Sequence, residues 1–182
     1  VKKLRQITNM EFDVHIMSMN NELFINEMLD IGAESITFHY ESSFHTDRLI
    51  NLVKRSGAKV GVALNPATSL SVLDYILPQC DSILLMLINP GFATDKGEKQ
   101  VSYADKKVKD LSELIRKNNL DVKIQVDGRV SLETIPKLVS AGADSLVVGS
   151  TSLFIPGNTI SENKKLLDIS ISEGLKGGNF NG

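Results

Sequence analysis

The chain of 182 residues has almost no cysteine, no excess of basic residues and no long apolar run. Its single cysteine, Cys80, excludes an internal disulfide framework and is typical of a reducing compartment. With 20 basic and 22 acidic residues and a pI near 5.9, the charge does not favour nucleic acid or an anionic membrane as a partner. No apolar run approaches the roughly 18 residues of a membrane span, and the first ten residues are polar rather than signal-like. We therefore expect a cytoplasmic protein that binds neither nucleic acid nor membrane.

The composition is that of an ordinary globular domain, with 42% hydrophobic and 23% charged residues. Short apolar runs alternate with segments of helical period. The expected strands are residues 10–17, 34–39, 59–64, 82–88, 122–127 and 144–149. The expected helices are residues 20–31, 46–56, 69–78, 101–118, 131–141 and 158–173. Apolar strands that alternate strictly with helices predict a parallel sheet covered by helices, and therefore an α/β fold.

Polar residues or glycines close nearly every expected strand, as His15, His39 and Asp127 do. In a closed barrel all carboxyl ends of the strands meet at one mouth, whereas an open doubly wound sheet collects only those near its switch point. The wide distribution favours a (β/α)8 TIM barrel, of which six strands are present and two are missing. We expect one barrel domain over residues 1–173 and a flexible, glycine-rich tail over residues 174–182.

Two side chains at strand ends are the first candidates for chemistry. Asp127 would point into the barrel mouth, and Gly128 behind it allows backbone to approach a ligand closely; a turn or a helix cap is the alternative interpretation. His15 shares a strand face with Asp13, which suits a metal ligand oriented by a carboxylate, or a hydrogen-bonded core histidine. His39 has the same two interpretations.

Glycine-bearing turns after three late strands are candidates for phosphate binding through backbone N–H groups. The turns and the side chains that could assist them include Gly91, Gly128, Arg129, Gly149 and Ser150. Each turn is weak evidence singly, but together they indicate a phosphate site of the kind that barrels form after their last strands.

Two further features each have an ordinary structural interpretation beside the functional one. His45 and Asp47 have the spacing of a ligand pair, but they fall where a helix begins, so we interpret Asp47 as a first-turn residue favoured by the helix dipole. The polar segment 94–110 is either a solvated loop and helix face or an active-site lid.

The motifs together resemble a known family. The segments "FDVHIM", "GAESITFHYE", "GVALNPATS", "MLINPGF", "VDGRV" and "AGADSLVVGSTSLF" have the order and approximate spacing of the ribulose-phosphate 3-epimerase family, which includes the allulose-6-phosphate 3-epimerases. The resemblance implies a TIM barrel of carbohydrate metabolism that epimerises C3 of a phosphorylated ketose with two aspartates as acid and base. The substrate pair would be ribulose 5-phosphate and xylulose 5-phosphate, or allulose 6-phosphate and fructose 6-phosphate. A divalent metal on two histidines and two aspartates is also implied, with zinc expected first and iron, manganese or cobalt as alternatives, and we expect a homo-oligomer.

The resemblance also assigns roles to individual residues. Asp127 matches the acid/base on the seventh strand, which is also a metal ligand, and His15 matches a metal ligand on the third strand. Met17 and Met86 match methionines that line the substrate site. The phosphate-binding loops correspond to Gly91, Gly128, Gly149 and Ser150. Arg129 stands where the family usually has a second glycine, so it would either add a charge to phosphate binding or crowd it.

The main departure is that the family's first two strands have no counterpart here. One of them carries a His-x-Asp-x-Met-Asp-Gly stretch, which would supply the second aspartate and two of the four metal ligands. We therefore expect that roughly 45–50 N-terminal residues are absent from this sequence. The alternative is a catalytically inactive paralogue that binds a sugar phosphate or a partner subunit. A decarboxylase or synthase barrel is expected least, because none of the six strand ends has the lysine on which such enzymes usually depend.

Overall fold

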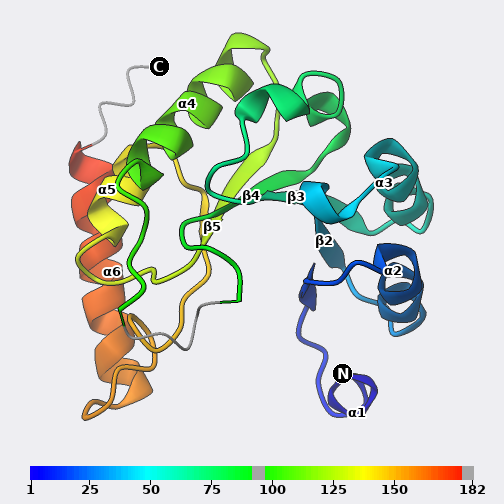
Figure 1. Cartoon of the computed structure of the whole chain (residues 1–182). Coiled ribbons are helices and arrows are strands. Elements are labelled where there is room, and N and C mark those ends of the chain that lie inside the picture. Colours follow the sequence, from blue (N-terminus) through cyan, green and yellow to red (C-terminus); the bar gives the residue numbers. More distant parts are fainter. Residues whose placement is uncertain (92–96, 178–182) are drawn as a thin grey trace. The chain divides into compact units, whose positions relative to one another are not determined.

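A computed structural model describes residues 1–91 and 97–177 (Figure 1). Its six strands form one sheet in the order of the chain. They are β1 (Asp13–Ile16), β2 (Ser35–His39), β3 (Lys59–Leu64), β4 (Ser82–Met86), β5 (Lys123–Asp127) and β6 (Ser145–Leu146). The pairs β1–β2, β2–β3 and β5–β6 are parallel. This agrees with the α/β architecture expected from the alternation of strands and helices.

Helices connect the strands. They are α1 (Lys2–Arg5), α2 (Asn21–Asp30), α3 (Thr46–Arg55), α4 (Ala104–Lys117), α5 (Ile135–Ser140) and α6 (Ile160–Gly177). Helix α3 shows why these segments are helical: Leu49, Ile50 and Val53 recur at helical spacing, and all three are buried. None of the helices in the described part of the chain is long and apolar enough to cross a membrane.

The chain divides into two compact units. Unit 1 comprises Val1–Leu64 and Thr68–Leu84, and its strands β2 and β3 contribute the fully buried Ile36, Phe38 and Val62. Helices α2 and α3 lie side by side in this unit and contact its strands (Figure 1). Burial of these apolar side chains stabilises unit 1 by roughly 1.5–3 kcal/mol each.

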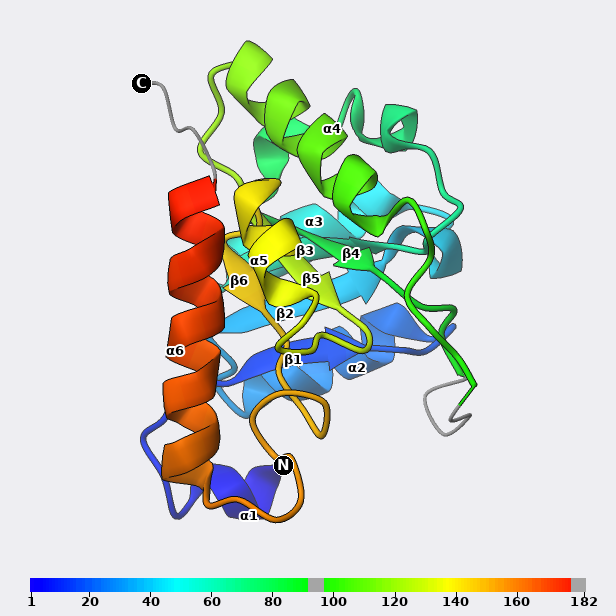
Figure 2. The ribbon, with the colours of Figure 1, turned by 90° about the vertical axis from the view of Figure 1, so that its left-hand side faces the viewer.

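Unit 2 comprises Asn65–Ala67 and Leu85–Gly182, and its core includes the buried Ile124 and Val126 of β5. Helix α6 runs alongside α5 (Figure 2). Gly174 permits this approach, because a Cβ there would lie 2.7 Å from Val139 Cβ and 2.8 Å from the carbonyl oxygen of Pro136. Helix α6 therefore continues to Gly177, four residues into the expected tail, and the rest of that tail lies outside the described residues.

The largest difference from the expected elements is at residues 69–78, where two 3₁₀ turns, η2 (Leu70–Leu73) and η3 (Leu77–Gln79), replace one helix. Pro78 has no N–H to donate to an α-helical ladder, and Ser69 instead accepts a hydrogen bond from the Ser71 N–H. A second difference is β6, which has two residues rather than six; beyond it, the Gly149 N–H donates to Ser152 Oγ. Cys80, which follows η3, is buried, and burial raises the pKa of its thiol to about 12.

Candidate functional site

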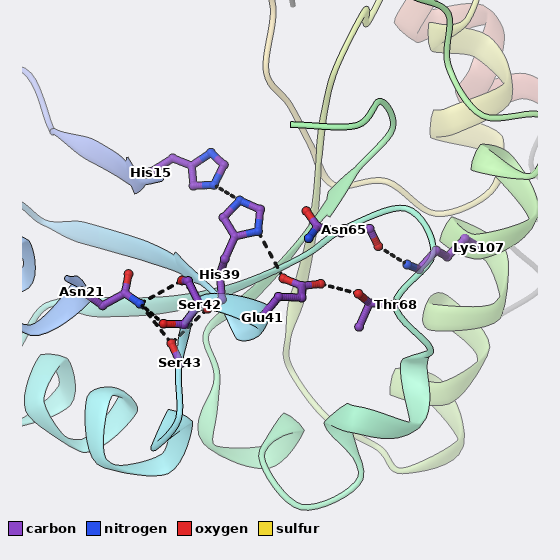
Figure 3. A network of polar contacts seen from close by, with 9 residues as sticks. All are labelled: His15, Asn21, His39, Glu41, Ser42, Ser43, Asn65, Thr68 and Lys107. Carbon is purple, nitrogen blue, oxygen red and sulfur yellow. Dashed lines mark hydrogen bonds and ion pairs between the residues drawn. The ribbon is translucent and has the colours of Figure 1, made fainter. Parts of the chain in front are cut away.

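The candidate residues of unit 1 lie at the carboxyl ends of β1 and β2. His15 is the third residue of β1 and His39 is the last residue of β2. Their Nε2 atoms are 3.0 Å apart (Figure 3). The ring centroids are 5.0 Å apart and the ring planes diverge by 25°, which is a stacked arrangement. One nitrogen must therefore carry a proton and the other must accept it.

His39 is held from its other side by Glu41. The Nδ1 atom of His39 lies 3.3 Å from Glu41 Oε2, and the hydroxyl of Thr68 donates to Glu41 Oε1 (Figure 3). His39 is 7% exposed, so this chain of contacts begins in the interior of unit 1. The position of Glu41 two residues after His39 was a signal in the motif "TFHYE" that sequence reasoning did not use.

The backbone of His39 is fixed as well. Its carbonyl oxygen accepts hydrogen bonds from Ser42 Oγ at 3.1 Å and from Ser43 Oγ at 2.9 Å. Asn21, at the start of α2, donates its Nδ2 to both hydroxyls and is 3% exposed (Figure 3). These bonds tie the turn after β2 to α2, so the ring of His39 projects from a rigid support.

The other predicted residues of unit 1 have simpler surroundings. Met17 follows β1 directly and is 59% exposed, so in the described chain it packs against little. His45 is the N-cap residue of α3, and Asp47 lies in the first turn of that helix. Asp47 Oδ1 accepts a hydrogen bond from Gln79 Nε2 at 2.8 Å. The interpretation of Asp47 as a first-turn residue is thus confirmed.

Asp127 is the last residue of β5, in unit 2, and its backbone oxygen accepts a hydrogen bond from the Leu87 N–H at 2.7 Å. Ile124 and Val126 are buried while Gln125 and Asp127 are half-buried, so alternation along the strand turns Asp127 away from the core. Strand pairing thus fixes the backbone and leaves the carboxylate on the more open face.

The turn after Asp127 requires glycine at its first position. Gly128 has φ +116°, and a Cβ there would lie 2.8 Å from Ile88 Cγ1 and 3.0 Å from the Ile88 backbone nitrogen. The next residue, Arg129, has φ +49°, in the left-handed region that favours glycine. A glycine would suit this backbone, and Arg129 adopts it nonetheless.

Two further side chains hold the loops of unit 2. Gln100 Nε2 donates to the carbonyl oxygens of Gly128 at 2.9 Å and Arg129 at 3.0 Å. Thr151 Oγ1 donates to the carbonyl oxygen of Val130 at 2.7 Å and so joins the turn after β5 to the turn after β6. Sequence reasoning missed both residues, because a side chain that binds a distant carbonyl leaves no local pattern.

The predicted phosphate-binding residues lie around these turns. The carbonyl oxygen of Gly149 accepts from the N–H groups of Ser152, Leu153 and Phe154, which makes a tight turn beside the exposed Ser150. A Cβ at Gly149 would meet no described atom within 4 Å, so packing within the chain does not explain the glycine. Met86, the last residue of β4, is buried, and Gly91 has φ +90°.

The polar segment 94–110 divides into three parts. Residues 94–96 lie outside the described chain, residues 97–103 form a loop that contains Gln100, and residues 104–110 begin α4. Lys107 of α4 donates through Nζ to the carbonyl oxygens of Asn65 at 2.8 Å and Pro66 at 2.9 Å (Figure 3). At least two of its polar side chains thus bind loop carbonyls, and the role of a lid stays a prediction.

The donor types present suit a divalent metal. An imidazole from His15 and a carboxylate from Asp127 are ligands that zinc and similar cations take. His15 belongs to unit 1 and Asp127 to unit 2, and each is described within its own unit. Among the residues that the structure describes, no three His, Cys, Asp or Glu side chains come together as a metal site.

Comparison with known proteins adds independent evidence. The model of the ribulose-phosphate 3 epimerase family matches residues 1–154. Ribulose-phosphate 3-epimerase of Methanocaldococcus jannaschii is 42% identical over 149 residues, which are 82% of this chain and 62% of that protein. The enzyme of the same name from Escherichia coli K12 is 37% identical over 161 residues, which are 88% of this chain and 68% of that protein. The chain thus spans roughly two thirds of the length of these relatives.

Solved structures show the fold. The 3-hexulose-6-phosphate synthase of Salmonella typhimurium matches with a TM-score of 0.63 and 18% identity, over 94% of this chain and 77% of that one. The tryptophan synthase α-subunit of Pyrococcus furiosus matches with a TM-score of 0.58 and 20% identity, over 96% of this chain and 70% of that one. With the six parallel strands, these likenesses confirm the expected barrel-type α/β fold with six strands present.

Proposed function

The chain belongs to the ribulose-phosphate 3-epimerase family, and from this we propose that the protein epimerises C3 of a phosphorylated ketose. The substrate pair is ribulose 5-phosphate and xylulose 5-phosphate, or allulose 6-phosphate and fructose 6-phosphate. The observation that carries the proposal is Asp127, a carboxylate at the carboxyl end of β5 and on its more open face. Catalytic residues of barrel enzymes lie at this end of the strands.

In the proposed reaction the Asp127 carboxylate exchanges a proton with C3 of the ketose. The neighbouring ketone makes that proton acidic, and a carboxylate positioned within hydrogen-bond reach is a suitable base. A second carboxylate must serve the opposite face of C3, and we assign it to the strands that have no counterpart in this sequence. A divalent cation on Asp127 would supply Lewis-acid stabilisation of the negative charge on the substrate oxygens. His15 is the second residue that we propose as a metal ligand.

The turns after β5 and β6 are the proposed phosphate site. Thr151 joins them, and Gln100 fixes the carbonyl side of the first turn, so that the positions of backbone N–H groups are set before substrate binds. Arg129 adds a positive charge to the first turn, and Gly149 leaves room beside the second. Phosphate held here would fix the distance between the sugar and Asp127.

Replacing Asp127 by Asn tests the proposal. The variant keeps the size of the side chain but removes the base, so we expect kcat to fall by several powers of ten in the protein of natural length. Deuterium exchange at C3 of the ketose should fall in parallel, and the melting temperature should stay close to that of the wild type.

The matched control is Asp121→Asn, which makes the same change at an exposed aspartate two residues before β5. This variant should keep its kcat within about twofold, because Asp121 pairs only loosely with Lys123 at 3.2 Å. A kcat of Asp127→Asn close to that of the control would refute the catalytic role.

A further inference from the structure

The turn after β6 contains a polar residue, Ser152, that is 0% exposed. We infer that Ser152 is a positioning residue for the phosphate group: its hydroxyl accepts the N–H of Gly149, so that the turn offers phosphate the N–H groups of Ser150 and Thr151. The inference deepens the proposed function and rests on it for the identity of the ligand. All of these residues belong to unit 2.

Ser152 binds both polar groups of the Gly149 backbone. The N–H of Gly149 donates to Ser152 Oγ at 3.2 Å, and the N–H of Ser152 donates to the Gly149 carbonyl oxygen at 3.1 Å. Serine hydroxyls that bind nearby backbone groups stabilise turns in this way. The N–H of Gly149 therefore has an acceptor inside the turn before any ligand binds.

The carbonyl oxygen of Gly149 is occupied more fully still. Besides the Ser152 N–H, it accepts the N–H of Leu153 at 3.0 Å and the N–H of Phe154 at 2.9 Å. A carbonyl oxygen without donors would repel an anion, because its partial charge is negative. The three donors compensate that charge within the turn, so the carbonyl oxygen is no obstacle to a bound phosphate.

The N–H groups of Ser150 and Thr151 remain for a ligand. Within the described residues neither group donates to an acceptor of the chain. Ser150 is exposed and Thr151 is half-buried, so the segment that carries both N–H groups borders solvent. Successive backbone N–H groups in a turn are typical donors to a bound anion. The turn thus has two N–H donors to offer, and the third is bound to Ser152.

The peptide units between Gly149 and Thr151 are held at both ends. Ser152 binds Gly149 at one end, and Thr151 Oγ1 donates to the carbonyl oxygen of Val130 at 2.7 Å at the other. Strand β6 is only two residues long and ends at Leu146, so these bonds fix a segment that follows the strand. Donors that are oriented before the ligand arrives lose less freedom on binding. Loss of the Ser152 hydroxyl should therefore weaken phosphate binding.

The decisive measurement is a titration of the wild-type protein of natural length with inorganic phosphate, followed through the backbone amide signals in ¹H–¹⁵N NMR spectra. The amides of Ser150 and Thr151 should shift most and should saturate together. The amide of Gly149 should shift less, because its N–H stays on Ser152. A dominant shift at Gly149 overturns the inference, and so does a titration that leaves the turn after β6 unchanged.

Ser152→Ala removes the hydroxyl from a fully buried position and adds no atom. Loss of one hydrogen bond typically changes an equilibrium by roughly twofold to tenfold. We expect the Kd for inorganic phosphate and the KM for the ketose phosphate to rise by a factor in this range, while kcat stays within about twofold of the wild type. A lower Kd would mean that the released Gly149 N–H joins the phosphate site, which overturns the inference.

The matched control is Ser170→Ala on α6 of the same unit. Ser170 is 8% exposed, and its hydroxyl donates to the carbonyl oxygen of Leu166 at 3.2 Å. This variant also removes a buried hydroxyl that binds backbone, so its melting temperature should fall about as much as that of Ser152→Ala. Its Kd for phosphate and its KM should stay unchanged. Equal phosphate affinities in the two variants would leave Ser152 only a structural role and overturn the inference.

The titration of the wild type needs no variant, so it decides the inference even if Ser152→Ala does not fold. The outcomes are separable from the proposed function. A protein that binds phosphate at Ser150 and Thr151 but does not epimerise a ketose phosphate refutes the epimerase activity alone. An active epimerase whose KM and phosphate affinity are unchanged by Ser152→Ala refutes this inference alone.

Discussion

The two units position their candidate catalytic groups in different ways. In unit 1, His15 is oriented by side chains that contact other side chains, through His39 and Glu41. In unit 2, Asp127 is positioned by its backbone, which is fixed by the Leu87 N–H and by the close packing of Gly128 on Ile88. A side-chain network can be weakened in steps, whereas a backbone packed without space admits no added atom. Substitutions in the side-chain network of unit 1 should therefore tune the site, and a side chain added at Gly128 in unit 2 should damage the fold.

The largest effect on stability should come from Gly128→Ala. The added methyl group meets the Ile88 backbone nitrogen at 3.0 Å, and φ +116° strains any residue with a Cβ. We expect a loss of roughly 3 kcal/mol in the free energy of unfolding, measured by urea denaturation.

The comparison variant is Gly57→Ala in unit 1. Gly57 has φ +85°, but a Cβ there meets no described atom within 4 Å. Only the backbone strain remains, so the loss should be about 1 kcal/mol. Equal losses in the two variants would show that packing on Ile88 does not distinguish the turn after Asp127.

A smaller effect is expected for Gln100→Leu, which removes the donor to the carbonyl oxygens of Gly128 and Arg129. Partly buried carbonyls that lose their donor should destabilise the protein by about 1–2 kcal/mol. If the turn binds phosphate as proposed, the KM for the ketose phosphate should rise more than kcat falls.

Gln79→Leu is the matched change in unit 1, where Gln79 donates to the exposed Asp47. Its cost should stay below about 0.5 kcal/mol, because water replaces an exposed hydrogen bond. A larger loss in Gln79→Leu than in Gln100→Leu would contradict the importance of the turn after β5.

The smallest effect concerns one exposed carboxylate in each unit. The Phe12 N–H and the guanidinium of Arg5 lower the pKa of Glu34, and the N–H and hydroxyl of Thr159 lower the pKa of Glu162. A carboxyl whose pKa is lower in the folded state stabilises the protein above its unfolded pKa, and this stability is lost as the pH falls through the folded pKa. Both Glu34→Gln and Glu162→Gln should therefore flatten the decline of the melting temperature below about pH 4.5. An unchanged decline in both variants would exclude these carboxyls as its source.

The alternation of apolar strands and amphipathic helices could be predicted from the sequence. Buried residues recur at the spacing of the helix or strand that they belong to, and this spacing is local. The five longer strands and the helices α2, α3 and α4 lie within three residues of the expected bounds. The segment 69–78 was expected to be helical from its period, but Pro78 and the serine cap favour 3₁₀ turns. The energy difference between a 3₁₀ turn and a turn of α-helix is small.

Only part of the candidate site could be predicted from the sequence. His15, Asp127 and Gly128 follow from their places at strand ends, and family resemblance assigned their roles. Gln100 and Thr151 could not be found, because each binds a carbonyl that is 21 to 29 residues away in the chain. A hydrogen bond of this kind depends on how loops fold back, which leaves no periodic trace in the sequence.

The sequence alone determined the α/β class and the strand ends on which polar residues gather. These depend on local spacing and on composition, which the chain carries without folding. Only the tertiary structure decided that His39 meets His15 through Nε2, that Glu41 lies behind His39, and that Gly128 has no room for a Cβ. Such facts depend on distances between segments far apart in the chain, and folding alone sets those distances.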